Sequence, residues 1–129
     1  MTRSLFDTHL LLWSVTEDPK LTTAARLAIL DPQNEPWFSL VSIWEIAIKF
    51  AKRSDIFPHA PMKIRTTLLD RGWQELDIQA EHLDATTALP PLHGDPFDRL
   101  LLAQARVEGM TLVTGDQTVA QYSGPVLRV

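Results

Sequence analysis

Residues 3–14, RSLFDTHLLLWS, pass from a short apolar run through a single aspartate into a second apolar run. The first run, which ends at Phe6, predicts a strand, and the second, which begins at Thr8, predicts a helix. The same order of strand, acidic residue and helix recurs along the chain, and such alternation is typical of an α/β protein with a parallel sheet. Right-handed crossovers place the residue after each strand at the carboxyl edge of the sheet, where open α/β folds bind ligands.

Outward from this stretch the pattern predicts the remaining elements. Further strands are expected at 37–40, 73–76, 110–113 and 126–127, and helices at 21–30, 42–53, 63–71, 80–88 and 96–108. The turn-forming segment 31–36, the prolines at 58 and 61, and Gly109 separate these elements.

The composition bounds the class of protein. The 129 residues fit one compact domain, 1–129, and 45% hydrophobic residues suffice to bury a core. No apolar run reaches the ~18 residues of a membrane span, and no cleavable leader is recognisable. The absence of cysteine excludes disulfides and thiolate metal sites and fits a reducing cytoplasm. At a net charge of −4, overall charge does not attract an anionic nucleic acid, so such a substrate would need metal ions and a local basic patch.

Acidic residues stand at or just inside the start of predicted helices: Asp7, Glu45, Asp95 with Asp98, and Asp116. Taken singly, each is compatible with helix capping, because free N–H groups and the helix dipole attract acids. Ser42 with Glu45 matches a capping box, and Asp95 with Pro96 matches the beginning of a helix. Capping is therefore an alternative for every one of them.

Taken together, the acids favour a metal site. Several carboxylates gathered at one sheet edge repel one another, and a divalent cation relieves that repulsion. The histidines at 9, 59, 82 and 93 show no ligand spacing, and His93 is interpreted as a structural loop residue. Oxygen ligation without cysteine or paired histidines favours Mg²⁺ or Mn²⁺ over Zn²⁺. Such a site can activate water and support displacement at phosphorus.

Four ordered pieces of the sequence resemble a PIN domain of the VapC toxin type, and they span nearly the whole chain. They are LFDTH with LLW at 5–13, SIWEIAIK at 42–49, HGDPFDRLL with AQA at 93–105, and LVTGD at 112–116. HGDPFDRLL is the most specific of them. The resemblance implies a three-layer PIN-like α/β fold, with a central, mostly parallel sheet of about four to five strands flanked by helices.

The resemblance also implies an activity. Members of this family are single-strand-type endoribonucleases that cut tRNA or other RNA with Mg²⁺ or Mn²⁺, commonly dimerise, and are inhibited by a VapB-like antitoxin. Residue by residue, Asp7, Glu45 and Asp98 match the acidic triad, and Asp116 matches the fourth acid. All four would serve as catalytic and metal-binding residues. Supporting positions are Thr8 and Thr114, whose hydroxyls could hold a carboxylate or a water, and Asp95, which could instead be the N-cap that shapes the loop.

The predicted helix 42–53 indicates contact with a partner. Its polar stripe is narrow and the rest is apolar, so the excess apolar face is expected to meet a second copy or an antitoxin segment. The alternative is that neighbouring helices cover this face. Lys49, Lys52 and Arg53 could guide RNA phosphates, or Lys49 could pair with Glu45. Arg99 could receive a phosphate or an antitoxin carboxylate, or pair with Asp95.

Other classes of function remain to be weighed. A haloacid dehalogenase pattern requires a second aspartate two positions after the first, where this chain has His9. A receiver domain requires a lysine after a late strand, and none follows 110–113. A non-catalytic PIN-like module that binds nucleic acid or protein remains the alternative, against which the intact acids argue.

Overall fold

The computed structural model describes residues 1–129 and has a single five-stranded sheet whose strands are all parallel, in the order β3-β2-β1-β4-β5. The strands are β1 (Thr2–Phe6), β2 (Asn34–Ser39), β3 (Gln74–Leu76), β4 (Thr111–Thr114) and β5 (Val126–Arg128). The expected α/β class, with a parallel central sheet of four to five strands, is confirmed.

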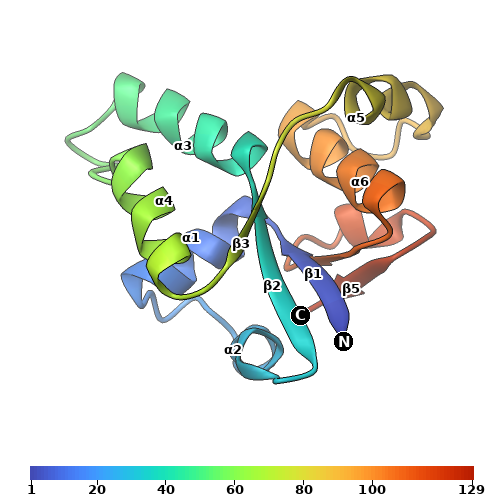
Figure 1. Cartoon of the computed structure of the whole chain (residues 1–129). Helices are drawn as coiled ribbons and strands as arrows, with labels where there is room; N and C mark the ends of the chain where they lie inside the picture. Colours follow the sequence, from blue (N-terminus) through green and yellow to red (C-terminus); the bar gives the residue numbers. More distant parts are fainter.

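Helices cover both faces of this sheet (Figure 1). They are α1 (Thr8–Thr16), α2 (Thr23–Leu30), α3 (Leu40–Lys52), α4 (Pro61–Asp70), α5 (Ala80–Ala85) and α6 (Pro96–Glu108), with short 3₁₀ turns η1 (Thr86–Ala88) and η2 (Val119–Gln121). Figure 1 shows α1, α3 and α4 on one side of the strands and α5 and α6 on the other, which gives three layers. No helix combines the length and the apolar character that crossing a membrane requires.

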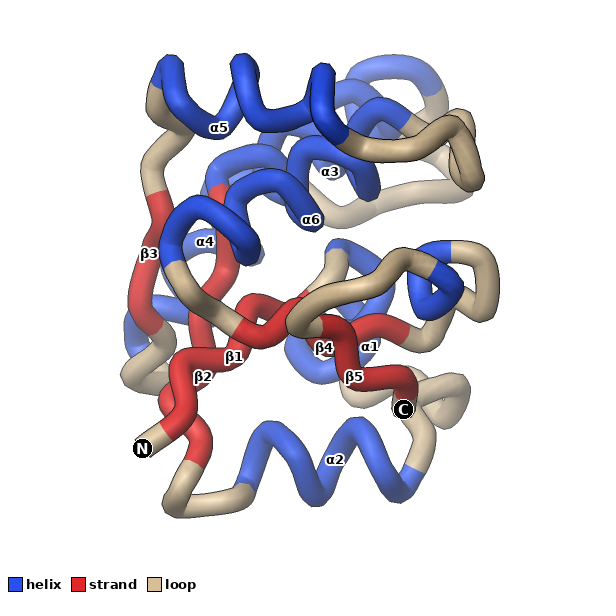
Figure 2. The backbone as a smooth tube through the Cα atoms, turned by 90° about the vertical axis from the view of Figure 1, so that its right-hand side faces the viewer, coloured by secondary structure: helices blue, strands red, loops and turns tan.

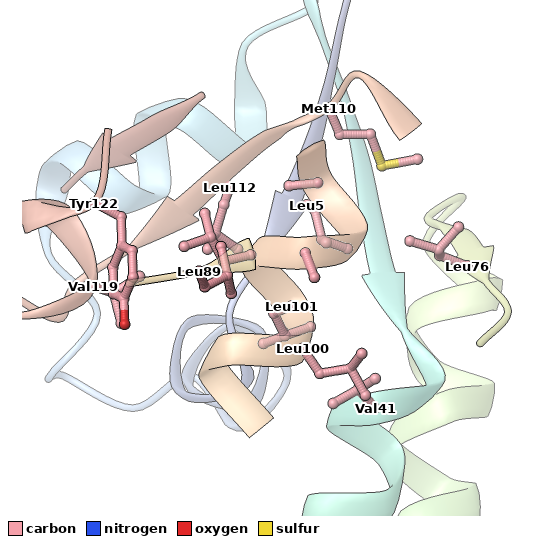
Figure 3. Close-up of a cluster of buried hydrophobic side chains, with 13 residues drawn as sticks. Leu5, Val41, Leu76, Leu89, Leu100, Leu101, Met110, Leu112, Val119 and Tyr122 are labelled. Carbon is pink, nitrogen blue, oxygen red and sulfur yellow. The ribbon is translucent and has the colours of Figure 1, made fainter. Parts of the chain in front are cut away.

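Alternation along the strands produces two cores. Successive strand side chains point to opposite faces, so Leu5 and Leu112 belong to one buried cluster while Phe6 and Val113 belong to the other. The first cluster joins the sheet to α6 (Figure 3), and the second joins it to α1, α2, α3 and α4. Each strand that carries an acid at its carboxyl end is thus fixed by packing on both faces.

Strand β2 and helix α3 begin earlier than the sequence predicts. Strand β2 includes Pro36, which lies in the predicted turn. Pro36 pairs with Ser4 on β1, whereas β3 reaches only as far as Trp37. At Pro36 the strand is therefore locally an edge, where a missing N–H is tolerated. Helix α3 begins directly after β2, with Ser39 as its N-cap.

The apolar surface of α3 is mostly covered within the chain. Val41, Ile43 and Ile46 are buried, and α3 packs against α1, α4 and α6. The alternative that neighbouring helices cover this face therefore holds for most of it. Trp44 is the exception, because 55% of it is exposed.

We expect Phe38→Ala to lower the free energy of unfolding by about 3–5 kcal/mol, because it opens a cavity around a fully buried ring in the second cluster. Urea unfolding measures this change, and an unchanged m-value shows that the two-state comparison is valid. Leu30→Ala is the matched control: Leu30 is 70% exposed, so a change within about 0.5 kcal/mol is expected. Similar losses for both variants would contradict the placement of this core.

Candidate metal centre

Asp7 lies where β1 ends and α1 begins. It is the N-cap of α1, and its Oδ1 accepts the Leu10 N–H at 2.9 Å. Its Oδ2 accepts the Thr114 hydroxyl at 2.6 Å and the Gly115 N–H at 3.3 Å. Only 5% of the residue is exposed. Burial raises the pKa of Asp7 above its usual value, and the hydrogen bonds from Thr114 and Leu10 oppose that rise.

Asp98 projects from the first turn of α6, which Asp95 positions. The Asp95 carboxylate accepts the N–H groups of Phe97 at 2.8 Å and Asp98 at 3.2 Å, as an N-cap does. The Oδ2 of Asp98 lies 2.7 Å from Nε2 of His93. Burial raises the pKa of Asp98 to about 6, and the charges of Asp95 and Asp7 contribute, although the His93 hydrogen bond lowers it. Asp7 is thus close enough for its charge to disfavour the charged form of Asp98.

Asp116 joins this group from the loop after β4. Its Oδ1 accepts the N–H groups of Thr118 at 2.7 Å and Val119 at 3.1 Å, and its own N–H donates to the Thr114 hydroxyl at 3.0 Å. Thr114 therefore links Asp116 to Asp7. One ligand atom each from His93, Asp98 and Asp116 lies within 4.8 Å of the others.

Glu45 lies on α3 and is not among the residues whose ligand atoms lie within 4.8 Å of one another. Thr8 donates its hydroxyl to Ser42 at 2.8 Å, which joins the beginning of α1 to α3 one turn before Glu45. Glu45 is 7% exposed, and its Oε2 lies 3.2 Å from the Lys49 ammonium. Its Oε1 is buried without a hydrogen-bond partner. A buried carboxylate oxygen left in this state is costly unless a cation or donor satisfies it.

The capping alternatives are resolved differently at each acid. The proposed capping box of Ser42 with Glu45 is wrong, because Ser39 is the N-cap of α3 and accepts the Val41 N–H at 3.0 Å. Asp7 and Asp95 do cap helices. The Asp98 carboxylate accepts no backbone N–H, and its hydrogen-bond partner is His93. Capping therefore explains neither Glu45 nor Asp98.

The basic residues considered for phosphate contact have different partners in the structure. Lys49 pairs with Glu45, Arg53 pairs with Asp55 at 3.0 Å, and Lys52 is exposed. Arg99 does not pair with Asp95. It donates instead to four backbone carbonyls and one hydroxyl, those of Thr86, Leu89, Pro90, His93 and Tyr122. Arg99 thereby holds the loop that carries His93, so its guanidinium is already in use.

His93 is the participant that the sequence did not identify as part of the site. Helical spacing gave no signal, because His93 lies in a loop before α6. The only signal was its place in the same HGDPFDRLL stretch as Asp98. Since Nε2 contacts Asp98, His93 orients that carboxylate in the way that outer partners orient metal ligands. Thr8 bonds Ser42 rather than an acid, whereas Thr114 does hold a carboxylate.

These side chains fit a divalent cation. Positive charge at this point would offset the repulsion between Asp7 and Asp98, both of which have raised pKa values. It would also satisfy the partnerless Oε1 of Glu45 if that oxygen turned towards it. The carboxylate oxygens are the ligands that Mg²⁺ and Mn²⁺ prefer.

Comparison with known proteins adds independent findings. Residues 4–125 match the family model described as PIN domain. The chain is 30% identical over 126 residues to Ribonuclease VapC22 of Mycobacterium tuberculosis, which covers 97% of this chain and 95% of that protein.

Solved structures share the fold at low sequence identity. VapBC2 from Rickettsia felis, bound to a DNA fragment from its promoter, gives a TM-score of 0.70 at 16% identity and covers 98% of each chain. A toxin-antitoxin complex from Klebsiella pneumoniae gives 0.69 at 19% identity, covering 96% of this chain and 95% of that one. DNA-bound VapBC from Salmonella typhimurium gives 0.70 at 14% identity, covering 99% and 98%.

We expect Asp98→Asn to stabilise the metal-free protein at about pH 8 but not at about pH 3.5. The pKa of about 6 in the folded protein lies above the usual aspartate pKa of 3.8. The folded state therefore holds the proton more tightly, and stability from this group is complete below pH ~4 and is lost as the pH rises through ~6. At 1.36 kcal/mol per pKa unit, the gain at high pH is about 1–3 kcal/mol.

Urea unfolding in the presence of a chelator, at a series of pH values, measures this difference. Asp55→Asn is the control, because Asp55 is exposed and its pKa is lowered by Arg53 rather than raised. A gain in stability for Asp98→Asn that did not depend on pH would contradict the raised pKa of Asp98.

Proposed function

The chain belongs to the PIN-domain family, and we propose that it is the ribonuclease toxin of a toxin–antitoxin pair. The observation that carries this proposal is the meeting of Asp7, Asp98 and Asp116 at one carboxyl edge of the sheet. Its similarity to Ribonuclease VapC22 supports the same activity.

We propose that Asp7, Glu45, Asp98 and Asp116 bind the metal. We propose further that this metal is Mg²⁺ or Mn²⁺. A cation bound there would lower the pKa of a water and neutralise charge on the phosphodiester oxygens. The chain's own residues prepare the site. Thr114 and Gly115 fix Asp7, while Asp95 and His93 fix Asp98. Because these partners are already in place, little reorganisation accompanies binding.

The proposed substrate is RNA, with tRNA or another structured RNA favoured. A net charge of −4 gives no general attraction for it, so binding would depend on the cation and on local basic groups. On α3, Lys52 is exposed and carries no ion pair, which makes it a better candidate for a phosphate contact than Arg53. RNA as substrate and an antitoxin as partner imply action in the cytoplasm.

The proposed partners are a VapB-like antitoxin and a second copy of the chain. Apolar side chains remain exposed on and beyond α3: Trp44 at 55%, Ile56 at 69% and Met62 at 59%. Exposed apolar surface of this kind is typical of protein–protein contact. The structural relatives named above as VapBC and toxin-antitoxin complexes support an antitoxin as one occupant.

We expect the purified chain, freed of any partner, to cleave RNA in Mg²⁺ or Mn²⁺ and to be inactive in a chelator. Asp7→Asn and Asp98→Asn should each lower the cleavage rate at least 100-fold, because each removes a negative ligand from the centre. Gel analysis of cleaved RNA measures the rates.

Asp31→Asn is the matched control, since Asp31 is exposed at the end of α2 and should leave the rate unchanged. Equal cleavage by all variants would mean a contaminating nuclease or another site. A folded chain that binds RNA without metal and does not cut it would favour the non-catalytic binding module.

We expect the product of an adjacent small reading frame to co-purify with this chain and to suppress cleavage. Trp44→Asp should weaken co-purification or dimerisation, because it puts a charge on an exposed apolar surface. Pull-down and light scattering measure the two outcomes. Leu83→Asp is the control: Leu83 is 53% exposed but lies on α5, away from α3. Equal effects of both substitutions would contradict the assignment of this surface.

A further inference from the structure

A cleft of about 440 Å³ opens beside the candidate metal centre. Asp7, Gly115 and Asp116 line one part of it, so it is continuous with two of the acids. The rest of the lining comes from α1, from the loop between α1 and α2, and from the end of β5: His9, Leu10, Trp13, Lys20, Thr22, Arg128 and Val129. Figure 2 shows the chain end after β5 close to the loop that enters α2.

The cleft contains two cationic side chains, those of Lys20 and Arg128, from opposite ends of the chain. Both residues are exposed, and neither ammonium nor guanidinium makes an ion pair or a side-chain hydrogen bond. Arg99 and Arg106 differ, because their guanidinium groups donate to backbone carbonyls. Parallel pairing sets Arg128 beside Thr114, at the same edge as the acids. Two unengaged cations beside an anionic centre are suited to bind an extended anion that also reaches that centre.

The cleft also contains an aromatic pair. His9 and Trp13, one helical turn apart on α1, stack with ring centroids 5.6 Å apart and an interplanar angle of 27°. His9 is exposed and Trp13 is partly exposed. His9 is near enough to Asp7 for its charge to affect that carboxylate. An exposed aromatic face next to cations is the combination that binds the bases of single-stranded nucleic acids.

We propose that this cleft binds a nucleotide of an unpaired RNA segment next to the phosphate at the acids, with its base on the His9–Trp13 pair and its phosphates at Lys20 and Arg128. This inference rests on the proposed nuclease function and adds to it the residues that hold a nucleotide beside the acids. Stacking needs a free base face, so the segment must be unpaired, as in a loop or a single-stranded end. Apolar ligands without negative charge would leave the two cations unused.

The test measures binding separately from cleavage. A fluorescein-labelled oligoribonucleotide is titrated with Asp98→Asn protein in a chelator, and fluorescence anisotropy gives the affinity at a series of salt concentrations. The double variant Lys20→Ala/Arg128→Ala should bind at least tenfold more weakly at low salt. Its slope of log affinity against log salt should fall by about 1.4, since each lost phosphate contact on a single strand contributes ~0.7.

The matched control is Lys63→Ala/Arg26→Ala, which removes the same two residue types from exposed positions outside the cleft. It should change the affinity less than about twofold and leave the slope unchanged. His9→Ala should weaken binding about tenfold, whereas His9→Phe, which keeps an aromatic face, should restore it. Melting temperatures of all variants, which alter exposed residues, should match that of the parent protein.

Equal slopes in the two double variants, or no RNA binding by the parent protein, would overturn this inference. Failure of this inference and failure of the proposed function give different results. RNA bound in the cleft but never cut by the unmutated chain would refute the nuclease and leave the cleft site standing. RNA cut by a chain whose cleft variants bind normally would refute the cleft site alone.

Discussion

The burial of the Asp7 carboxylate is the constraint on which the rest of the site depends. A charge with this little exposure is stable only if hydrogen bonds replace the water that it loses. The donors come from two separate parts of the chain: the first turn of α1 supplies the Leu10 N–H, and the end of β4 supplies the Thr114 hydroxyl and the Gly115 N–H. The same contacts that make burial tolerable therefore fix β1, α1 and β4 relative to one another, and Thr114 extends this order to Asp116 through its N–H.

Asp98 is held in place by a different set of contacts. Asp98 stands on a regular helix, but its partner His93 lies in a loop whose backbone needs acceptors and donors of its own. One guanidinium, that of Arg99, satisfies carbonyls at Thr86, Leu89 and Pro90, and the Tyr122 hydroxyl accepts the His93 N–H at 2.9 Å. The loop is thereby rigid enough to keep imidazole and carboxylate in contact. Burial is the main cause of the raised pKa of Asp98, and the hydrogen bond from His93, which this loop holds in place, opposes it.

The sequence predicted the parts of the site that depend on local order. Asp7 and Asp116 come directly after β1 and β4, so their positions at the carboxyl edge follow from topology. Asp98 follows a loop rather than a strand, but it lies at the beginning of α6, which leads back to the start of β4, so topology places it at the same edge. The sequence could not predict what depends on contacts between distant segments. The cap of α3 at Ser39 follows from where β2 ends, and β2 includes Pro36 only because β3 is too short to pair with it. Likewise, the bond from Thr8 to Ser42 and the role of Arg99 become visible only once the helices are packed.

The electrostatics of the edge explain how an acidic chain could act on an anion. Without a cation, the charge of Asp7 disfavours that of Asp98. The same negative charges would repel the phosphates of an RNA strand. A bound divalent ion reverses the sign of the local field, while Lys20 and Arg128 remain attractive in either state. Metal and RNA would then raise each other's affinity, because linkage between two ligands is reciprocal. On the proposed assignment, the negative charge of the acids prevents RNA from entering productively until the metal is in place, and the neighbouring cleft contributes affinity that does not depend on the metal.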